Sequence, residues 1–426
     1  MADYQGLKDW LYSLQVFGIK LGLSSTQALL KRLGDPQNSF PSVHLAGTNG
    51  KGSSAAMLAS VLTAAGLKVG LYTSPHLVSF RERFLVAGRM PSRQRLAQTM
   101  AQVRAVVVDQ EPPTFFEFTT ALAFEYFKEQ GVDLAVIETG LGGRLDATNV
   151  LLPKVVLISD ISVEHTQHLG ASLKLIAWEK AGIIKPGRPV ATQALKPQAA
   201  RVVEARAKEL KAPLFRLGRE FKARWTRTGL SYKGLSWEMK GLKMELAGRH
   251  QGPNAALALA GLELLAQDGL ALSQEAVRRG LAEVVWPGRL HTISAKPRLI
   301  LDGAHNPGAC RALVRTLERI ERRRLIVVLG AMADKDLRSM VRILGRAADR
   351  LILTRAAYER SAQPRQLARL AQEMGFGFRL VPELMAALAA AQAAAGPEDL
   401  IVVTGSLFIV GEVLAGLNMP TFPEDA

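Results

Sequence analysis

Cysteine is almost absent from this sequence, since Cys310 is the only one in 426 residues. A single thiol forms neither an intramolecular disulfide nor a cysteine-based metal site, and such a shortage is typical of proteins in a reducing compartment. The first residues include Asp3, Lys8 and Asp9 and lack the apolar core of a signal peptide, so we expect no export. The predicted localisation is cytoplasmic.

Long apolar runs are missing as well. The most apolar stretch, residues 255–265, is shorter than the ~20 residues that a membrane-spanning helix needs, and Glu263 interrupts it. We therefore expect no membrane partner. Acidic residues are outnumbered, with 38 Asp and Glu against 54 Lys and Arg and a net charge of +16. A basic balance favours anionic partners, namely nucleotide phosphates, polycarboxylates or nucleic acid, without choosing among them.

The strongest motif is Gly-Thr-Asn-Gly-Lys-Gly-Ser at residues 47–53, between a strand pattern at 43–46 and a helical pattern at 53–65. In a loop of this kind, glycines turn successive backbone amides toward phosphate oxygens at the helix N-terminus. Lys51 adds a positive charge, and the Ser53 hydroxyl can reach Mg²⁺. The motif predicts that ATP is bound by Asn49, Gly50, Lys51, Gly52 and Ser53.

Strand and helix patterns alternate along much of the chain, which indicates a doubly wound α/β fold. Short apolar runs at 69–72, 134–137 and 155–159 suit buried parallel strands. Residues 215–246 are more polar and favour a small antiparallel sheet, and the breaker Trp-Pro-Gly-Arg at 286–289 marks a boundary. We predict a P-loop mononucleotide-binding domain with a parallel sheet at 1–287, a linker at 288–297, and a smaller Rossmann-like α/β domain at 298–426.

The loop departs from the common G-x-x-x-x-G-K-[ST] spacing, because Gly52 separates Lys51 from Ser53. The sequence Gly-Thr-Asn-Gly-Lys resembles the phosphate loop of the Mur ligase superfamily of ATP-dependent amide synthetases. The extra glycine before the serine resembles the loop of its folate branch, the dihydrofolate and folylpolyglutamate synthases. The resemblance extends over nearly the whole chain. It implies a ligase that adds L-glutamate to dihydropteroate, to a reduced folate, or to both, through an acyl phosphate, with release of ADP and phosphate.

Glu138 directly follows the predicted strand 134–137 and precedes a glycine-rich run at 139–149. Parallel strands end at the same edge of a sheet, so an acid here can meet Mg²⁺ over the phosphate loop. Alone, a strand-end glutamate is more often a surface residue. The resemblance implies that Glu138 is a metal ligand, together with Ser53 and with Ser74 beyond the strand 69–72.

Two further residues, His165 and Lys180, are assigned a role only by the resemblance. His165 would bind a second Mg²⁺, although the family usually has Asp-His-Thr-Asp here and Glu164 and Gln167 replace both aspartates. Spacing alone makes Lys180 a solvated helix-end residue, but the matching lysine of the family is carbamylated, which turns a cation into a carboxylate. Carbamylation needs a neutral amine, which a desolvated lysine supplies. The resemblance thus implies two Mg²⁺ sites and three catalytic residues, Lys51, Lys180 and His305.

The remaining matches concern the substrates. Asn254 would contact adenine, Arg289 the phosphates and Asp302 the ribose, while His305 would lie near the acyl phosphate and the incoming glutamate. Without the resemblance, Asn254 is interpreted as a helix N-cap, and His305 with Asn306 as a turn. The matches for the pterin or folate substrate are Arg83, Thr114, Phe115, Phe116 and Glu117, although the phenylalanines alone would be assigned to a core.

Three alternatives remain. One is a folylpolyglutamate synthase without dihydrofolate synthase activity. A cell-wall Mur ligase carries a further substrate domain before its phosphate loop, for which the segment before Gly47 is too short. A P-loop NTPase that binds nucleic acid would explain the charge but not the set Glu138, His165 and Lys180. We therefore expect a monomer that binds ATP, Mg²⁺, L-glutamate and dihydropteroate or a reduced folate, and that binds no nucleic acid.

Overall fold

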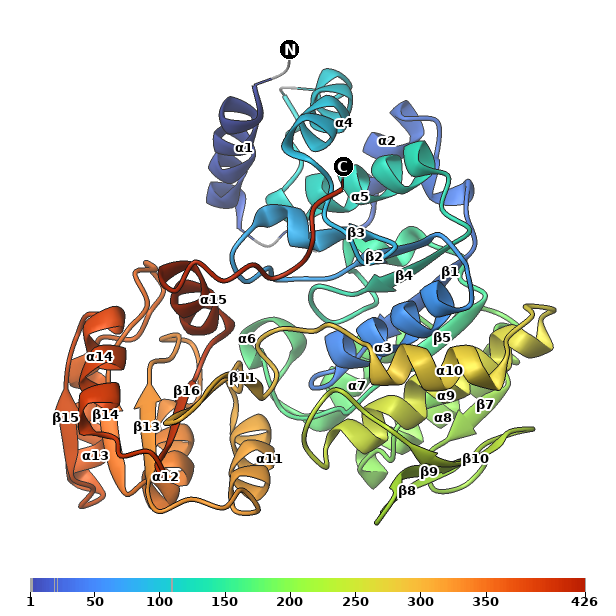
Figure 1. The fold of residues 1–426 in the computed structure, drawn as a ribbon. Coiled ribbons are helices and arrows are strands. Elements are labelled where there is room, and N and C mark those ends of the chain that lie inside the picture. Colours follow the sequence, from blue (N-terminus) through green and yellow to red (C-terminus); the bar gives the residue numbers. More distant parts are fainter. Residues whose placement is uncertain (1–2, 19, 21, 109, 426) are drawn as a thin grey trace.

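The structure is a computed structural model that describes residues 3–18, 20, 22–108 and 110–425. It has two parts, each built on its own β-sheets with helices on the sheet faces (Figure 1). The N-terminal part holds a seven-stranded and a three-stranded sheet, and the C-terminal part holds a six-stranded sheet. This architecture confirms the predicted α/β fold with a second α/β unit. Among the described helices, none has both the length and the apolar character needed to cross a bilayer.

The seven-stranded sheet has the order β3-β2-β4-β1-β5-β6-β7, with β3 antiparallel to β2 and the other neighbours parallel. Register pairs Leu45 of β1 with Glu138 of β4 and with Leu157 of β5, so these central strands end at one edge. The strands are β1 (Ser42–Ala46), β2 (Val69–Tyr72), β3 (Phe84–Val86), β4 (Leu134–Glu138), β5 (Val155–Ile158), β6 (Val190–Thr192) and β7 (Leu214–Arg216).

Four strands of this sheet were predicted, and β1, β2, β4 and β5 are confirmed to within one residue at each end. Each is buried along its whole length, which produces the uninterrupted apolar run that the prediction used. Strands β3, β6 and β7 were not predicted, because three residues are too few to show a period.

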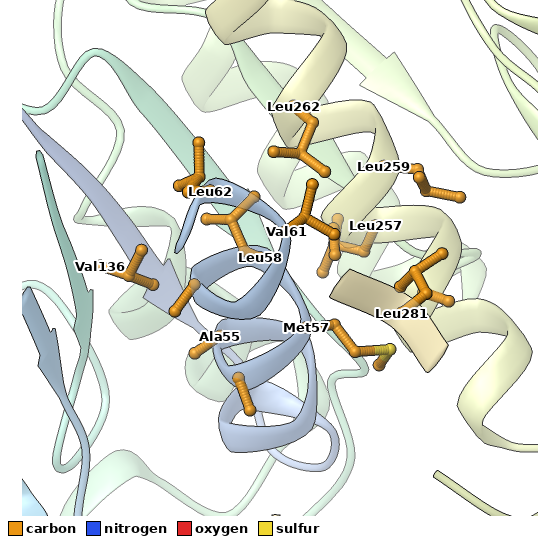
Figure 2. Packing of buried hydrophobic residues seen from close by; sticks show 14 of the residues in the cluster. Ala55, Met57, Leu58, Val61, Leu62, Val136, Leu257, Leu259, Leu262 and Leu281 are labelled. Carbon is orange, nitrogen blue, oxygen red and sulfur yellow. The ribbon is translucent and has the colours of Figure 1, made fainter. Parts of the chain in front are cut away.

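Helices α3 (Lys51–Ala64), α9 (Gln251–Gln267) and α10 (Gln274–Ala282) cover one face of this sheet and form an apolar core with it (Figure 2). Leu58 and Leu62 of α3, Leu257 and Leu262 of α9, and Val136 of β4 belong to this core. The other helices of the N-terminal part are α1 (Tyr4–Ser13), α2 (Ser24–Arg32), α4 (Arg93–Ala105), α5 (Phe115–Gln130), α6 (Thr166–Leu169), α7 (Leu173–Ala181) and α8 (Pro197–Glu209).

Helix α9 starts earlier than predicted. His250 is its N-cap and Gln251 its first residue, so Asn254 lies inside the first turn. The interpretation of Asn254 as an N-cap is therefore wrong.

The predicted antiparallel sheet is confirmed by β8 (Lys222–Thr226), β9 (Gly229–Lys233) and β10 (Glu238–Leu242). Glu263 of α9 attaches this sheet to the core, since its buried carboxylate accepts hydrogen bonds from the Tyr232 hydroxyl and from the backbone N–H groups of residues 235–237. A charged residue inside an apolar helix is thus explained by satisfied hydrogen bonding.

The six-stranded sheet has the order β11-β12-β16-β13-β14-β15, parallel except for β11 against β12. Strand β11 falls within the predicted linker 288–297, so half of that segment is part of the second sheet; the domain boundary itself stays a prediction. The strands are β11 (His291–Ala295), β12 (Arg298–Asp302), β13 (Leu325–Leu329), β14 (Arg350–Leu353), β15 (Phe378–Leu380) and β16 (Leu400–Thr404), and the helices are α11 (Pro307–Leu317), α12 (Leu337–Ala347), α13 (Pro364–Glu373), α14 (Leu384–Ala394) and α15 (Leu407–Gly416).

After α15 the chain returns to the N-terminal part, where the last described residues lie close to β3 and α5 (Figure 1). The Met90 N–H donates to the Pro423 carbonyl at 2.8 Å, and Arg81 forms an ion pair with Glu424 at 2.6 Å. The two parts are therefore joined twice, by the segment before β11 and by this C-terminal tail.

Gly280 of α10 lies so close to α3 that an added Cβ would overlap the backbone of Val61. We expect Gly280→Ala to lower the free energy of unfolding by about 1–3 kcal/mol, because two helix backbones cannot yield as a flexible side chain does. Chemical denaturation measures this loss. Gly377→Ala is the matched control, since nothing lies within 4 Å of its added Cβ. Equal stability of the two variants would contradict the close packing of α3 and α10.

Candidate active site

A cavity of about 510 Å³ lies at the carboxyl edge of the central strands, and residues of both parts line it. It brings together side chains that are far apart in the sequence, as the crevice at the strand ends of a doubly wound sheet does. Thirteen of the predicted site residues line this cavity: Asn49, Gly50, Lys51, Gly52, Ser53, Ser74, Glu138, His165, Lys180, Asn254, Arg289, Asp302 and His305.

The glycine loop joins the end of β1 to the start of α3 and is folded tightly. Gly47 and Gly50 have φ angles of 152° and 89°, which residues with a side chain rarely adopt. A Cβ would overlap Ser159 Oγ at the first position and Asn254 Oδ1 at the second. The Thr48 N–H donates to the Asp160 carbonyl at 2.6 Å, which fixes the loop to the end of β5.

Two lysines converge on this loop. Lys51 Nζ and Lys180 Nζ donate to the same Gly47 carbonyl oxygen, at 3.1 and 2.6 Å. Lys180 lies near the C-terminus of α7 and is buried, so the interpretation of it as a solvated residue is wrong. Burial first, and then the positive charge of Lys51, lowers the pKa of Lys180 to about 7. This shift favours the neutral amine.

Glu138 is the last residue of β4 and is buried against the loop lysine. One carboxylate oxygen lies 3.8 Å from Lys51 Nζ, and the other accepts from the Ser74 N–H at 3.4 Å. Burial raises the pKa of Glu138, and the charge of Lys51 opposes this rise. The structure thus brings Glu138, Ser74 and the phosphate loop together, as parallel strand ends predict.

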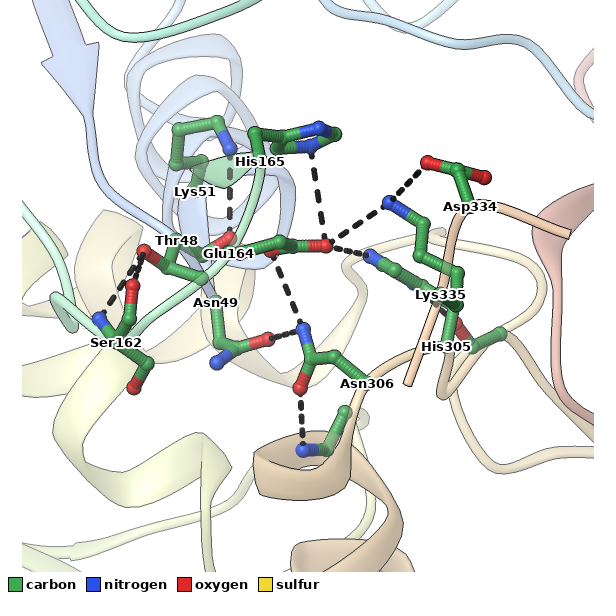
Figure 3. A network of polar contacts seen from close by, with 12 residues as sticks. Thr48, Asn49, Lys51, Ser162, Glu164, His165, His305, Asn306, Asp334 and Lys335 are labelled. Carbon is green, nitrogen blue, oxygen red and sulfur yellow. Dashed lines mark hydrogen bonds and ion pairs between the residues drawn. The ribbon is translucent and has the colours of Figure 1, made fainter. Parts of the chain in front are cut away.

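The loop before α6 carries His165 and Glu164 (Figure 3). Burial, assisted by the charge of Lys335, lowers the pKa of His165 to about 4, so its imidazole is neutral at physiological pH and has a lone pair for a metal ion. The side chain of Glu164 is 9% exposed and contacts Lys335 and His305 of the C-terminal part, each at 3.3 Å. Burial raises the pKa of Glu164, but hydrogen bonding and charge from His305, followed by Lys335, outweigh it and hold the pKa well below its ordinary range.

Asn254 lies beside the loop with both ends of its amide in use. Its Oδ1 accepts from Gln193 Nε2 at 2.7 Å, and its Nδ2 donates to Gln251 Oε1 at 2.8 Å. The Gln251 amide nitrogen is buried and has no hydrogen-bond partner among the described residues, although Gln251 lines the cavity. An orphaned buried donor in a cavity wall fits a polar ligand such as a nucleotide.

The C-terminal part contributes the ends of β12 and the start of α11. Asp302 accepts from the N–H groups of Leu290 and Ala304, each at 2.9 Å, which fixes the segment that carries Arg289. Asn306 is the N-cap of α11, and its Nδ2 donates to Asn49 Oδ1 in the phosphate loop at 2.9 Å. The turn interpretation of His305 and Asn306 therefore missed a contact between the two parts.

The five residues predicted for the folate substrate do not line this cavity. Thr114 and Glu117 form a capping box at the start of α5 and satisfy each other's backbone N–H groups. Phe116 lies against Gly140 of the glycine-rich run, where an added Cβ would overlap its ring. The Arg83 guanidinium lies 5.2 Å from the ring centre of Phe115.

Arg83 and Phe115 belong to a separate cluster with further aromatic side chains. Arg83 Nε donates to His76 Nδ1 at 3.0 Å, and its guanidinium also lies 5.8 Å from the ring centre of Phe80. Tyr12 packs edge-on against Phe115 with ring centres 5.5 Å apart. Sequence reasoning missed Tyr12, His76 and Phe80, because their proximity to Arg83 depends on how α1 and the loop after β2 fold together.

Two family models match this chain. The Mur ligase middle domain matches residues 45–262, and the Mur ligase, glutamate ligase domain matches residues 288–407. The dihydrofolate synthase/folylpolyglutamate synthase of Bacillus subtilis is 34% identical over 96% of this chain and 98% of its own length. The chain spans about half the length of relatives from Halobacterium salinarum and Haloferax volcanii, named as probable bifunctional folylpolyglutamate synthase/dihydropteroate synthases.

Solved structures agree with these relatives. The Escherichia coli FolC complex with DHPP and ADP is 33% identical, has a TM-score of 0.89 and covers 97% of both chains. The bifunctional folylpolyglutamate synthase/dihydrofolate synthase of Yersinia pestis in complex with AMPPNP and Mn is 34% identical, with a TM-score of 0.89 over 97% of this chain and 98% of that chain. A structure of a bifunctional folylpolyglutamate synthase/dihydrofolate synthase with Mn, AMPPNP and L-glutamate bound is also 34% identical, with a TM-score of 0.88. This chain therefore belongs to the dihydrofolate synthase/folylpolyglutamate synthase family of ATP-dependent Mur ligases.

Proposed function

We propose that this chain joins L-glutamate to dihydropteroate, to a reduced folate that already carries glutamate, or to both, with cleavage of ATP to ADP and phosphate. One observation carries the proposal: a phosphate loop with two lysines and Glu138 faces Asp302 and His305 of the other part across one cavity. The E. coli relative in complex with DHPP and ADP, and the bifunctional relative with L-glutamate bound, support this choice of substrates.

The chemistry explains why both parts are needed. A carboxylate oxygen is a poor leaving group, so ATP first converts the acceptor carboxylate to an acyl phosphate. The loop amides and Lys51 hold the phosphates during this transfer. The amine of glutamate then attacks the acyl carbon, and the contacts from the C-terminal part keep water away from the acyl phosphate. Because one chain supplies both sides of the cavity, we propose a monomer that needs no nucleic acid.

The residues at the strand ends also fit divalent metal ions. Oxygen donors from Ser53, Ser74 and Glu138 and the neutral nitrogen of His165 are the ligand types that Mg²⁺ and Mn²⁺ accept. Bound metal ions would stabilise the negative charge of the phosphoryl group in transfer. We assign Ser53, Ser74 and Glu138 to one site and His165 with Lys180 to a second, and the Mn-bound Y. pestis relative supports metal binding here.

Lys180 fits the second site only as a carbamate. Its ammonium form would repel a cation, whereas the neutral amine can take up CO₂ and become an anion. The buried position beside Lys51 supplies the neutral amine and a compensating positive charge. For the folate substrate we assign Arg83 and Phe115 as direct contacts, because a cation beside an aromatic ring suits an anionic aromatic ligand. Thr114, Phe116 and Glu117 then position the start of α5.

The first experiment follows phosphate release and product mass with MgATP and L-glutamate, adding dihydropteroate, a reduced folate, or neither. We expect release to depend on an acceptor and to match a glutamate-sized mass gain. Gain with both acceptors means a bifunctional enzyme, and gain with reduced folate alone means a folylpolyglutamate synthase. Acceptor-independent hydrolysis without mass gain would contradict the ligase and favour a nucleic-acid-dependent NTPase, whose binding would weaken steeply with salt.

Gly50→Ala tests the phosphate loop. The new methyl group overlaps Asn254 Oδ1 at a residue with a φ angle of 89°, so we expect the affinity for AMPPNP to fall by about tenfold or more, measured by calorimetry. Gly66→Ala is the control, because it imposes the same backbone strain at a φ angle of 93° where nothing lies within 4 Å. Unchanged affinity in Gly50→Ala, or an equal loss in both variants, would count against the assignment.

Carbamylation is tested by ¹³C NMR in ¹³C-bicarbonate. We expect a carbamate signal above about pH 7 that is lost as the pH falls, because protonation of Lys180, whose pKa is about 7, removes the amine that reacts with CO₂. Lys180→Gln should lack the signal and lose about 10–100-fold in turnover. Lys174→Gln, an exposed lysine on the same helix, should keep both. A signal that survives Lys180→Gln would refute the assignment.

A further inference from the structure

Glu164 joins the loop before α6 to two loops of the C-terminal part (Figure 3). Its Oε1 lies 3.3 Å from His305 Nε2 and 3.3 Å from Lys335 Nζ, and its Oε2 accepts from Asn306 Nδ2 at 3.3 Å. Three donors from one part thus surround one carboxylate of the other.

We propose that Glu164 is a positioning residue for the glutamate-addition step, holding His305 and Lys335 over the phosphate loop. The proposal rests on the ligase function inferred above. Glu164 does not act on reacting atoms itself, because donors occupy both of its carboxylate oxygens. It acts through the side chains that it orients.

The neighbouring contacts show how the position of Glu164 is transmitted. His305 directs its other ring nitrogen, Nδ1, at the Gly303 carbonyl at 2.8 Å. Both partners of the ring are acceptors, so the imidazolium form donates to Gly303 and pairs with Glu164 at the same time, and the two contacts together fix the ring plane. Asn306 links Glu164 to Asn49 of the phosphate loop while its own Oδ1 caps α11. One continuous set of hydrogen bonds therefore runs from the phosphate loop through Asn306 and Glu164 to His305 and Lys335.

The backbone at this point indicates that the loop needs an anchor. His165 directly follows Glu164 and has a φ angle of 52°, the left-handed conformation that β-carbon-bearing residues adopt at a cost. Such strain persists where surrounding contacts hold it. The contacts of Glu164 with the C-terminal part supply this support, and they exist only when the two parts are close together.

A competing interpretation predicts the opposite change in the KM for glutamate. His305, Lys335 and Asn306 are donors that would suit a carboxylate of the incoming glutamate, so Glu164 could instead occupy their binding site and compete with the substrate. Removing the charge of Glu164 would then strengthen glutamate binding. Under the positioning role, the same change weakens it, so the direction of the KM change for glutamate separates the two.

The test compares Glu164→Gln, Glu164→Asp and wild type in steady-state ligation with varied glutamate and varied ATP. For Glu164→Gln we expect kcat to fall by about 10–100-fold and the KM for glutamate to rise, while the KM for ATP changes by less than about threefold. Glu164→Asp keeps the charge and should recover a large part of kcat. Glu424→Gln is the matched control, because it removes another contact between the parts, with Arg81, that does not line the cavity.

A double-mutant cycle with Lys335→Met gives a second, independent measure. If Glu164 acts through Lys335, the double variant Glu164→Gln, Lys335→Met should be no slower than the slower single variant. Thermal denaturation of each variant checks the fold. If Glu164→Gln does not fold, Glu164→Asp and Lys335→Met are compared with wild type instead. Under the positioning role, both variants should raise the KM for glutamate.

Failure of this inference is distinct from failure of the ligase function. Wild-type protein without acceptor-dependent ligation refutes the function. A wild type that ligates, with a Glu164→Gln variant of unchanged kcat or of lowered KM for glutamate, refutes the positioning role alone. Additive losses in the double-mutant cycle would also overturn it.

Discussion

The Gly47 carbonyl oxygen accepts hydrogen bonds from the side-chain nitrogens of Lys51 and Lys180, and the rest of the site depends on this shared contact. Burial of Lys180, and then the positive charge of Lys51 beside it, lowers the pKa of Lys180. Glu138 is near enough to Lys51 to offset part of the charge, at 3.8 Å. The neighbours of the loop therefore keep it ordered and electropositive, so an anionic ligand does not have to reorganise the site when it binds.

The contact requires the order of elements around it. Lys51 comes from the start of α3, Glu138 from the end of β4 and Lys180 from the C-terminal turn of α7, and each reaches the loop because parallel strands end at one edge of the sheet. The glycines allow this approach, since Ser159 and Asn254 occupy the space that side chains at Gly47 and Gly50 would need. Topology, more than any single side chain, places the chemistry.

The sequence predicted what local pattern and topology determine. Strands with four or more buried residues, such as β12, β13 and β16, left clear apolar runs, whereas the three-residue strands β3, β6 and β15 left none. The phosphate loop and Glu138 followed from a motif at a strand end. The burial of Lys180 could not be predicted, because it depends on the packing of α7 against the loop. Nor could the network of Glu164, whose partners Asn306 and Lys335 follow it by 142 and 171 residues.

Contacts between the two parts are polar around the cavity and partly apolar away from it. Away from the cavity they are close and partly apolar, for Phe422 of the tail packs on Trp286 and α15 approaches Leu77 so closely that Gly411 has no room for a Cβ. Around the cavity they are polar, and polar contacts exchange with water at small net cost. A ligase must admit its substrates and then exclude water from an acyl phosphate. Contacts that hold firmly on one side and exchange on the other allow the cavity to do both.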